Sequence, residues 1–250
     1  MHAPMHALPY ALTLAAHAAL ATVALAVGLA ALASAKGGRL HRRAGRGYAR
    51  AIAGVAGTGL LLTAARPTLR LAALLLLTAY PTWSGVRVLA RKRPDMDPAE
   101  RATGADWAVA AGTLVLAFAI LSASALGVGG RGDGTVRGFA GFVAAMAAYD
   151  LWRFARPAAR PMGPRLWLRE HIGKLTGAYF GAVSAFSGNV FTAVPDPWRV
   201  LGPNLLGVVV MAYFLVRVRQ GGRRRAAPLA AARGGAVGGT AAGGAAQAAA

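Results

Sequence analysis

The sequence predicts an all-α protein: a polytopic transmembrane helix bundle of about seven spans, with its N-terminus outside and its C-terminus in the cytoplasm. Hydrophobic residues make up 56% of the 250 residues and the mean hydropathy is +0.47, both high for a soluble chain. Only 14% of the residues are charged, and they gather between apolar runs of membrane-spanning length. The net charge of +20 therefore indicates membrane topology, and we expect no nucleic-acid partner.

The apolar runs predict a transmembrane domain over residues 1–220. Its predicted spans are 8–35, 48–65, 68–90, 106–127, 137–153, 171–194 and 200–218. The first run is too long for a signal peptide and is followed at once by a dense basic block, so we expect it to remain as a helix. Residues 221–250 are rich in Ala and Gly, and we predict a disordered basic tail there because few large apolar residues are available to pack.

The distribution of positive charge sets the predicted orientation. Of the 28 Lys and Arg residues, the ones on the predicted outer side are Arg66, Arg70, Arg131, Arg137 and Arg199. All the others, Lys174 included, fall on the predicted cytoplasmic side, where positive charge is enriched in membrane proteins. We expect the lipid bilayer as a partner, with anionic lipid at the cytoplasmic face. The excess of Arg over Lys is typical of a high-GC bacterium and suggests a bacterial inner membrane.

The sequence excludes several kinds of chemistry. It contains no cysteine, which rules out disulfides, iron–sulfur clusters, thiolate metal sites and cysteine nucleophiles. It also lacks the P-loop, zincin and hydrolase motifs. Polar side chains at membrane depth are then the candidates for function. Two of the five histidines lie in the N-terminal segment, which leaves His17, His41 and His171.

Each of these histidines also has a structural interpretation. His17 lies in the outer half of the first span, where it could form a hydrogen bond across the bundle, ligate haem or handle protons. His41 could be an interfacial residue of the basic loop before the second span. His171 could cap the sixth span or pair with Glu170.

The predicted depths limit which histidines can act together. His41 and His171 both fall at the cytoplasmic edge, where imidazoles from different helices could ligate one haem b iron from opposite faces. Arg42 and Arg46 could hold its propionates, since Arg binds carboxylates bidentately. A helical rise of about 1.5 Å per residue places His17 roughly 27 Å from the inner end of its span, so it is a second, separate position.

The order of these residues resembles a family. His17, followed by Lys36, Gly37, His41, Arg42, Gly45 and Tyr48, is similar to a bacterial family of predicted multi-pass membrane proteins catalogued as a domain of unknown function. His171 and Tyr179 match a late helix of that family, from which the chain departs at residues 174–177. The resemblance covers about residues 10–190 and implies a helical membrane domain without an assigned activity.

A fainter resemblance is to the transmembrane dihaem cytochromes b, which implies bound haem and electron transfer. Those proteins need four histidines, so the three here allow one bis-histidine haem. We therefore predict an uncharacterised inner-membrane protein with one haem b held by His41 and His171. One alternative is a small-solute or proton carrier that uses His17, Asn189 and Asn204 at the outer side. Another is a non-catalytic membrane scaffold in which every histidine is structural.

Overall fold

The computed structural model describes residues 7–128, 134–156, 165–195 and 198–220; the predicted tail 221–250 lies outside them. The described residues form seven α-helices, which confirms the all-α class. The helices are α1 (Ala7–Ala33), α2 (Arg39–Ala65), α3 (Leu69–Arg87), α4 (Gly104–Ala125), α5 (Gly134–Ala155), α6 (Leu166–Val190) and a C-terminal helix (Trp198–Gln220). Two short 3-10 helices, η1 (Val88–Ala90) and η2 (Pro98–Glu100), lie between α3 and α4.

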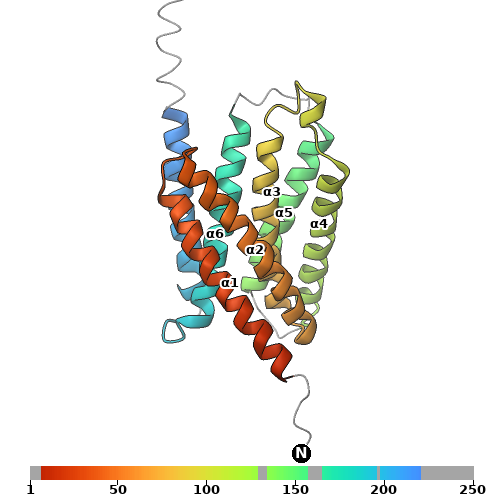
Figure 1. The fold of residues 1–250 in the computed structure, drawn as a ribbon. Helices are drawn as coiled ribbons and strands as arrows, with labels where there is room; N and C mark the ends of the chain where they lie inside the picture. Colours follow the sequence, from red (N-terminus) through yellow and green to blue (C-terminus); the bar gives the residue numbers. More distant parts are fainter. Residues whose placement is uncertain (1–6, 129–133, 157–164, 196–197, 221–250) are drawn as a thin grey trace, which may run out of the picture.

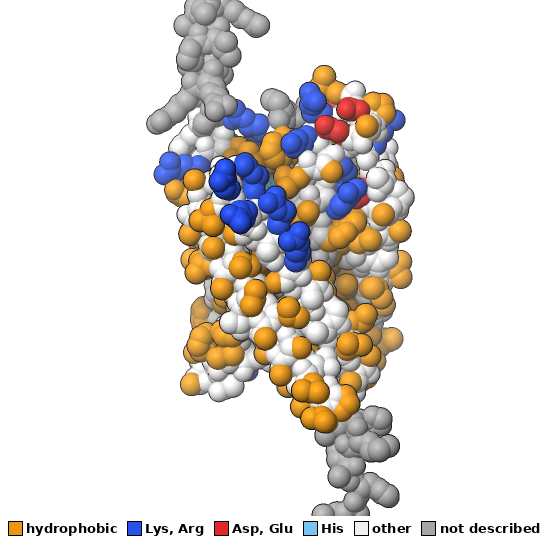
Figure 2. Space-filling view, viewed as in Figure 1, with side chains coloured by type: hydrophobic (Ala, Val, Ile, Leu, Met, Phe, Trp, Pro, Cys, Tyr) orange, Lys and Arg blue, Asp and Glu red, His pale blue; other side chains and the backbone are white. Residues whose placement is uncertain are grey.

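The helices form one elongated bundle (Figure 1), with α1 and α2 crossing in front of the others. α3 is central, because it contacts α2, α4, α5 and α6. The turn between α1 and α2 and the segment between α3 and α4 lie at the same end of the bundle. Lys and Arg side chains gather at that end (Figure 2), and we call it the basic end.

Five helices are long and apolar enough to cross a membrane, and the chain is a multi-pass membrane protein. The five are α1, α2, α3 with η1, η2 with α4, and the C-terminal helix. Large apolar side chains lie exposed on their outer faces, for example Leu12, Val115 and Val209, each more than 60% exposed. Such a surface suits lipid rather than water. α5 and α6 do not reach the same hydropathy, because charged residues interrupt them.

Small residues let the inner helices approach closely. Ala73 of α3, Ala110 of α4 and Ala140 of α5 are all fully buried in one core, where Leu77 and Val143 fill the remaining space. Close packing of backbones replaces the hydrophobic driving force that is missing between helices in lipid. This core fixes the relative positions of α3, α4 and α5.

Two helices begin more than one turn earlier than the apolar runs predicted. α2 begins at Arg39 rather than at residue 48, and α6 at Leu166 rather than at residue 171. Gly37 has φ 75° and makes the reversal after α1, so the good helix formers of the basic block can continue directly into α2. His41 is therefore a helical residue and not part of a loop. Lys174, predicted on the cytoplasmic side with the loop charges, is also helical and is only 4% exposed.

Candidate functional site

Two imidazole rings from distant parts of the chain lie side by side near the basic end. His41 is in the first turn of α2 and His171 in the second turn of α6. Their ring centroids are 6.5 Å apart and the ring planes are 77° from parallel. The structure thus brings together the two histidines that the sequence placed at one edge, on helices that have few direct contacts with each other.

A backbone carbonyl orients each ring. His41 Nδ1 is 2.9 Å from the carbonyl oxygen of Ala31, and His171 Nδ1 is 2.9 Å from that of Gly85. A carbonyl can only accept a hydrogen bond, so both Nδ1 atoms carry a proton, and in the neutral form of each ring Nε2 has the lone pair. Among the described residues, no hydrogen bond reaches either Nε2. This is the tautomer and the support that a metal-ligating histidine uses.

Two tyrosines pack about two helical turns further along α2 and α6. Tyr48 is 3% exposed, and its ring centroid lies 6.1 Å from that of Tyr179. A Cβ on Gly28 of α1 would lie 2.6 Å from the Tyr179 ring and 2.9 Å from the Tyr48 ring. Gly28 therefore lets α1 close over the pair, a role that the sequence pattern did not reveal. A Cβ on Gly45, in contrast, would meet nothing within 4 Å.

The two arginines proposed for propionates lie at the basic end near His41. Arg42 is exposed and its guanidinium donates to the carbonyl oxygen of Gly37. Arg46, one turn further along α2, is also exposed. Both contribute to the positive surface of this end, and neither is needed to neutralise a buried carboxylate among the described residues.

The polar residues expected to form an outer carrier site do not meet. His17 Nδ1 lies 2.9 Å from Thr58 Oγ1, so the hydrogen bond expected across the bundle joins α1 to α2. Asn204 donates to Ser184 Oγ at 2.6 Å, which joins the C-terminal helix to α6. Asn189 is exposed and donates to a carbonyl of its own helix. Each of these three side chains therefore has a nearby hydrogen-bond partner, as expected of residues with a structural role.

The sequence pattern missed a buried ion pair between α5 and α6. Lys174 Nζ lies 2.5 Å from Asp150 Oδ1 and donates to Ser84 Oγ at 2.8 Å. Asp150 Oδ2 accepts from Ser84 Oγ at 2.6 Å and from Tyr80 Oη at 2.7 Å. All four residues are at most 4% exposed. Ionisable residues inside a membrane domain mark function by default, and here they connect α3, α5 and α6.

A second buried carboxylate lies at the basic end of α4. Asp106 is fully buried and accepts from Arg87 Nε and Nη2, each at 2.9 Å. It also accepts from the backbone and hydroxyl of Thr103, which closes a capping box at the start of α4. Arg91 Nη1 lies 2.8 Å from Asp106 Oδ1. The Asp106 carboxylate therefore forms ion pairs with both Arg87 and Arg91.

Two imidazoles are too few ligands for a zinc site and could instead serve as the protein ligands of a haem. No group of three or more His, Cys, Asp or Glu suited to a metal exists within the described segments. Two imidazoles suffice as axial ligands where a porphyrin supplies the other four nitrogens. The chemistry of the donor set thus fits haem better than zinc, which needs three or four protein ligands.

The chain matches no protein-family model, no curated protein and no solved structure. The resemblances inferred from its motif residues are therefore carried by the sequence alone and remain predictions.

Proposed function

We propose that this multi-pass membrane protein is a single-haem b-type redox protein, with the haem iron between His41 and His171. One observation carries the proposal: both rings have Nδ1 on a backbone carbonyl and Nε2 without a partner among the described residues. The two ring centroids lie 6.5 Å apart, so the same two imidazoles would be the residues that hold the haem iron.

The surrounding residues have defined roles in this proposal. The carbonyls of Ala31 and Gly85 hold the rings and raise the basicity of Nε2. Arg42 and Arg46 are within the first turns of α2 and offer bidentate partners for propionates. Bound haem would supply a one-electron couple, whose potential the axial ligands and the buried surroundings tune.

The proposal includes a seven-span bundle with its N-terminus outside, in a bacterial plasma membrane. The gathering of Lys and Arg at the basic end supports a cytoplasmic location for that end (Figure 2). The same positive surface favours contact with anionic lipid. The resemblance to the family of unknown function and to dihaem cytochromes b agrees with this architecture, and three usable histidines limit the protein to one bis-histidine haem.

An absorption spectrum of the protein purified from haem-replete cells tests the proposal. We expect a Soret band that His41→Ala and His171→Ala each abolish, because each removes one axial ligand. His17→Ala is the matched control: it removes an imidazole from the same bundle and should leave the band unchanged. A colourless wild-type preparation would overturn the proposal in favour of the scaffold.

A ligand exchange gives a second readout. His171→Met keeps a ligand at that position but replaces nitrogen by thioether sulfur, which raises the reduction potential of a haem. We expect this variant to retain a Soret band with a midpoint potential more positive than that of the wild type. An unchanged potential would show that His171 is not an axial ligand.

A further inference from the structure

A row of arginines follows one side of α2 from the basic end toward the middle of the bundle. Its members are Arg39, Arg43, Arg46 and Arg50, and we call them the arginine face. Their spacing of four, three and four residues places them on one side of a helix. All four are exposed, and Figure 2 shows Lys and Arg side chains in a band that descends from the basic end over the front of the molecule.

Contacts between α1 and α2 give the depth of this face. A Cβ on Gly47 would lie 3.8 Å from Val27 of α1, and a Cβ on Gly54 would lie 3.0 Å from Leu20. Arg50 lies midway between these two contacts along α2, and is therefore level with a point about nine residues before α1 ends. A helical rise of about 1.5 Å per residue places it roughly 13 Å below the end of this uncharged helix.

The length of α2 leads to the same depth. Its 27 residues span about 40 Å, whereas the hydrocarbon core of a bilayer is about 30 Å thick. With the far end of α2 at the opposite membrane surface, only the first turns, with Arg39 and Arg43, extend beyond the core. Arg50 then lies on the lipid-exposed surface inside the core, where a charge without a counter-ion is unfavourable.

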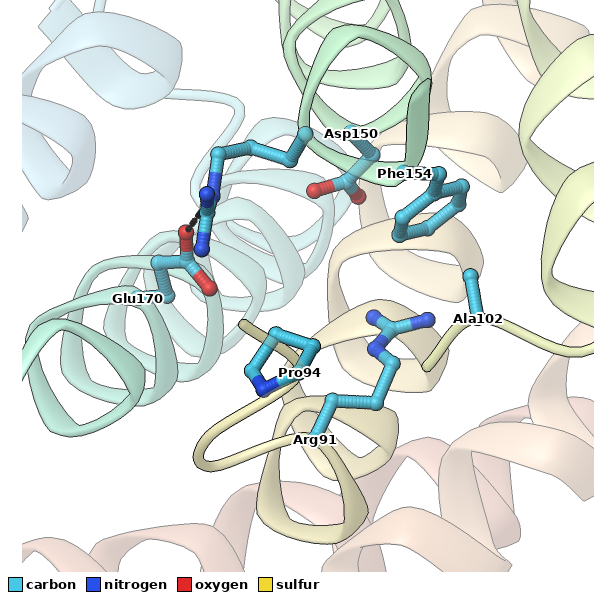
Figure 3. Close-up of a pocket in the computed structure, with 7 residues that line it drawn as sticks. Arg91, Pro94, Ala102, Asp150, Phe154 and Glu170 are labelled. Atoms are coloured by element: carbon cyan, nitrogen blue, oxygen red, sulfur yellow. Dashed lines mark ion pairs between the residues drawn. The ribbon is translucent and has the colours of Figure 1, made fainter. Parts of the chain in front are cut away.

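Among the described residues, no carboxylate reaches the arginine face. Residues 1–94 contain no Asp or Glu, so α1, α2 and α3 have no acidic side chain. Asp106 and Asp150 form ion pairs elsewhere in the bundle. Figure 3 shows Asp150 and Glu170 beside a pocket at the ends of α5 and α6, where a dashed line marks the ion pair of Glu170 with Arg153. The counter-ion of the arginine face must therefore come from another molecule.

The same side of α2 changes character past Arg50. No charged residue follows in α2, and Leu61, eleven residues further along, is 61% exposed. The surface is thus positive near the basic end and apolar below it. A phospholipid has the same division between its phosphate and its acyl chains, whereas a free phosphate ion would use only the positive part.

We propose that the arginine face binds the headgroup of an anionic phospholipid, with Arg50 drawing the phosphate inward along α2. Guanidinium groups match phosphate oxygens bidentately. Arg46 is one turn from both Arg43 and Arg50, close enough for neighbouring side chains to share one phosphate. The apolar surface around Leu61 contacts the acyl chains of the bound lipid.

This site makes the lipid contact of the proposed function specific, and it rests on the placement of the basic end at a membrane surface. It does not depend on haem. Arg46 is also a proposed propionate partner, so the variants below leave it unchanged. A missing Soret band would overturn the haem proposal alone, and a missing lipid effect would overturn this one alone.

Thermal unfolding of the intact protein in detergent tests the site. Added phosphatidylglycerol should raise the melting temperature saturably, by about 3 °C at tenfold excess over Kd, relative to phosphatidylcholine with the same acyl chains. Glycerol phosphate, a free headgroup, should give no such shift. Equal melting temperatures in the two lipids overturn the proposal and leave an acidic partner helix as the source of the counter-charge. An equal shift with glycerol phosphate overturns it in favour of a free anion.

Variants assign the effect to α2. Arg43→Gln and Arg50→Gln should each weaken the apparent affinity for phosphatidylglycerol at least fivefold. Arg93→Gln removes the same charge from an exposed position after α3, at the same end of the bundle, and should leave the affinity unchanged. If Arg93→Gln weakens the affinity as much as Arg50→Gln, the attraction is a property of the whole basic end and the proposal fails.

Arg50→Leu separates lipid binding from a general folding defect. In phosphatidylcholine this variant should melt above the wild type, because it removes an exposed charge at lipid depth. In phosphatidylglycerol it should lose that advantage, because only the wild type gains the bound headgroup. A difference between the two proteins that is the same in both lipids contradicts the assignment of Arg50.

Discussion

The α1–α2 pair and the α3–α5–α6 group bury polar side chains in different ways. Between α1 and α2 the polar groups are half-buried and uncharged: His17 shares a hydrogen bond with Thr58, and the His41 ring contacts the carbonyl oxygen of Ala31. Between α3, α5 and α6 the buried groups are full charges, Asp150 and Lys174, with Ser84 beside them. Removing an uncharged hydrogen bond between two helices should lower the stability only modestly. Removing one partner of a buried ion pair costs more, because it leaves a charge in a low-dielectric interior.

The largest expected effect is therefore in the ion pair. Lys174→Met leaves Asp150 charged and buried, and should lower the free energy of unfolding by about 3–5 kcal/mol. The double variant with Asp150→Asn should recover much of this loss, because Asn still accepts from Tyr80 and Ser84. Denaturant unfolding in detergent, analysed as a double-mutant cycle, measures both. Lys92→Met removes an exposed lysine and should change stability by no more than about 0.5 kcal/mol. If the two Lys variants are equally stable, the contrast between the two regions is wrong.

A medium effect is expected where α3 and α6 touch. A Cβ on Gly85 would lie 1.9 Å from Leu175 Cδ2 and 3.0 Å from Lys174 Cβ. Gly85→Ala should therefore push the helices apart and cost about 1–3 kcal/mol. Gly112→Ala in α4, where a Cβ would meet nothing within 4 Å, should stabilise by up to about 1 kcal/mol through helix propensity alone. Equal melting temperatures for the two variants would contradict the tight contact.

The smallest effect is expected in the α1–α2 pair. The Thr58 hydroxyl donates to the carbonyl oxygen of Gly54 at 2.9 Å, so His17 Nδ1 is the donor toward Thr58 Oγ1. His17→Ala and Thr58→Val should show a coupling energy of about 0.6 kcal/mol, as is usual for hydrogen bonds between membrane helices. A coupling several times larger in the same unfolding assay would show that α1–α2 depends on polar contacts as strongly as α3–α5–α6.

The sequence predicted the parts of the fold that depend on local composition. Long apolar runs gave the seven helices, and the basic blocks predicted that His41 and His171 would share one end. Helix starts were less predictable, because a basic stretch such as residues 39–47 has low hydropathy but good helix propensity. Hydropathy reports the environment that a segment prefers, and not where its backbone becomes helical.

The ion pair was not predictable in the same way. Asp150 and Lys174 are 24 residues apart, and each lies near the end of an apolar run, where a single charge is usually interfacial. Their pairing depends on how α3, α5 and α6 pack, which no local pattern encodes. A usable signal was present: Lys174 lies inside the predicted span 171–194 rather than before it, and a charge within a span calls for a partner.

The same pair has a consequence for how the chain enters the membrane. α5 and α6 are the two helices that fall short of the hydropathy of a spanning segment. Inserted alone, each would carry an unmatched charge that costs about 2.5–3.5 kcal/mol at the centre of a helix, and less toward its end. Inserted as a hairpin, they neutralise each other, while Ser84 and Tyr80 of the earlier α3 complete the hydrogen bonds. We therefore expect α5 and α6 to enter the bilayer as a pair rather than one after the other.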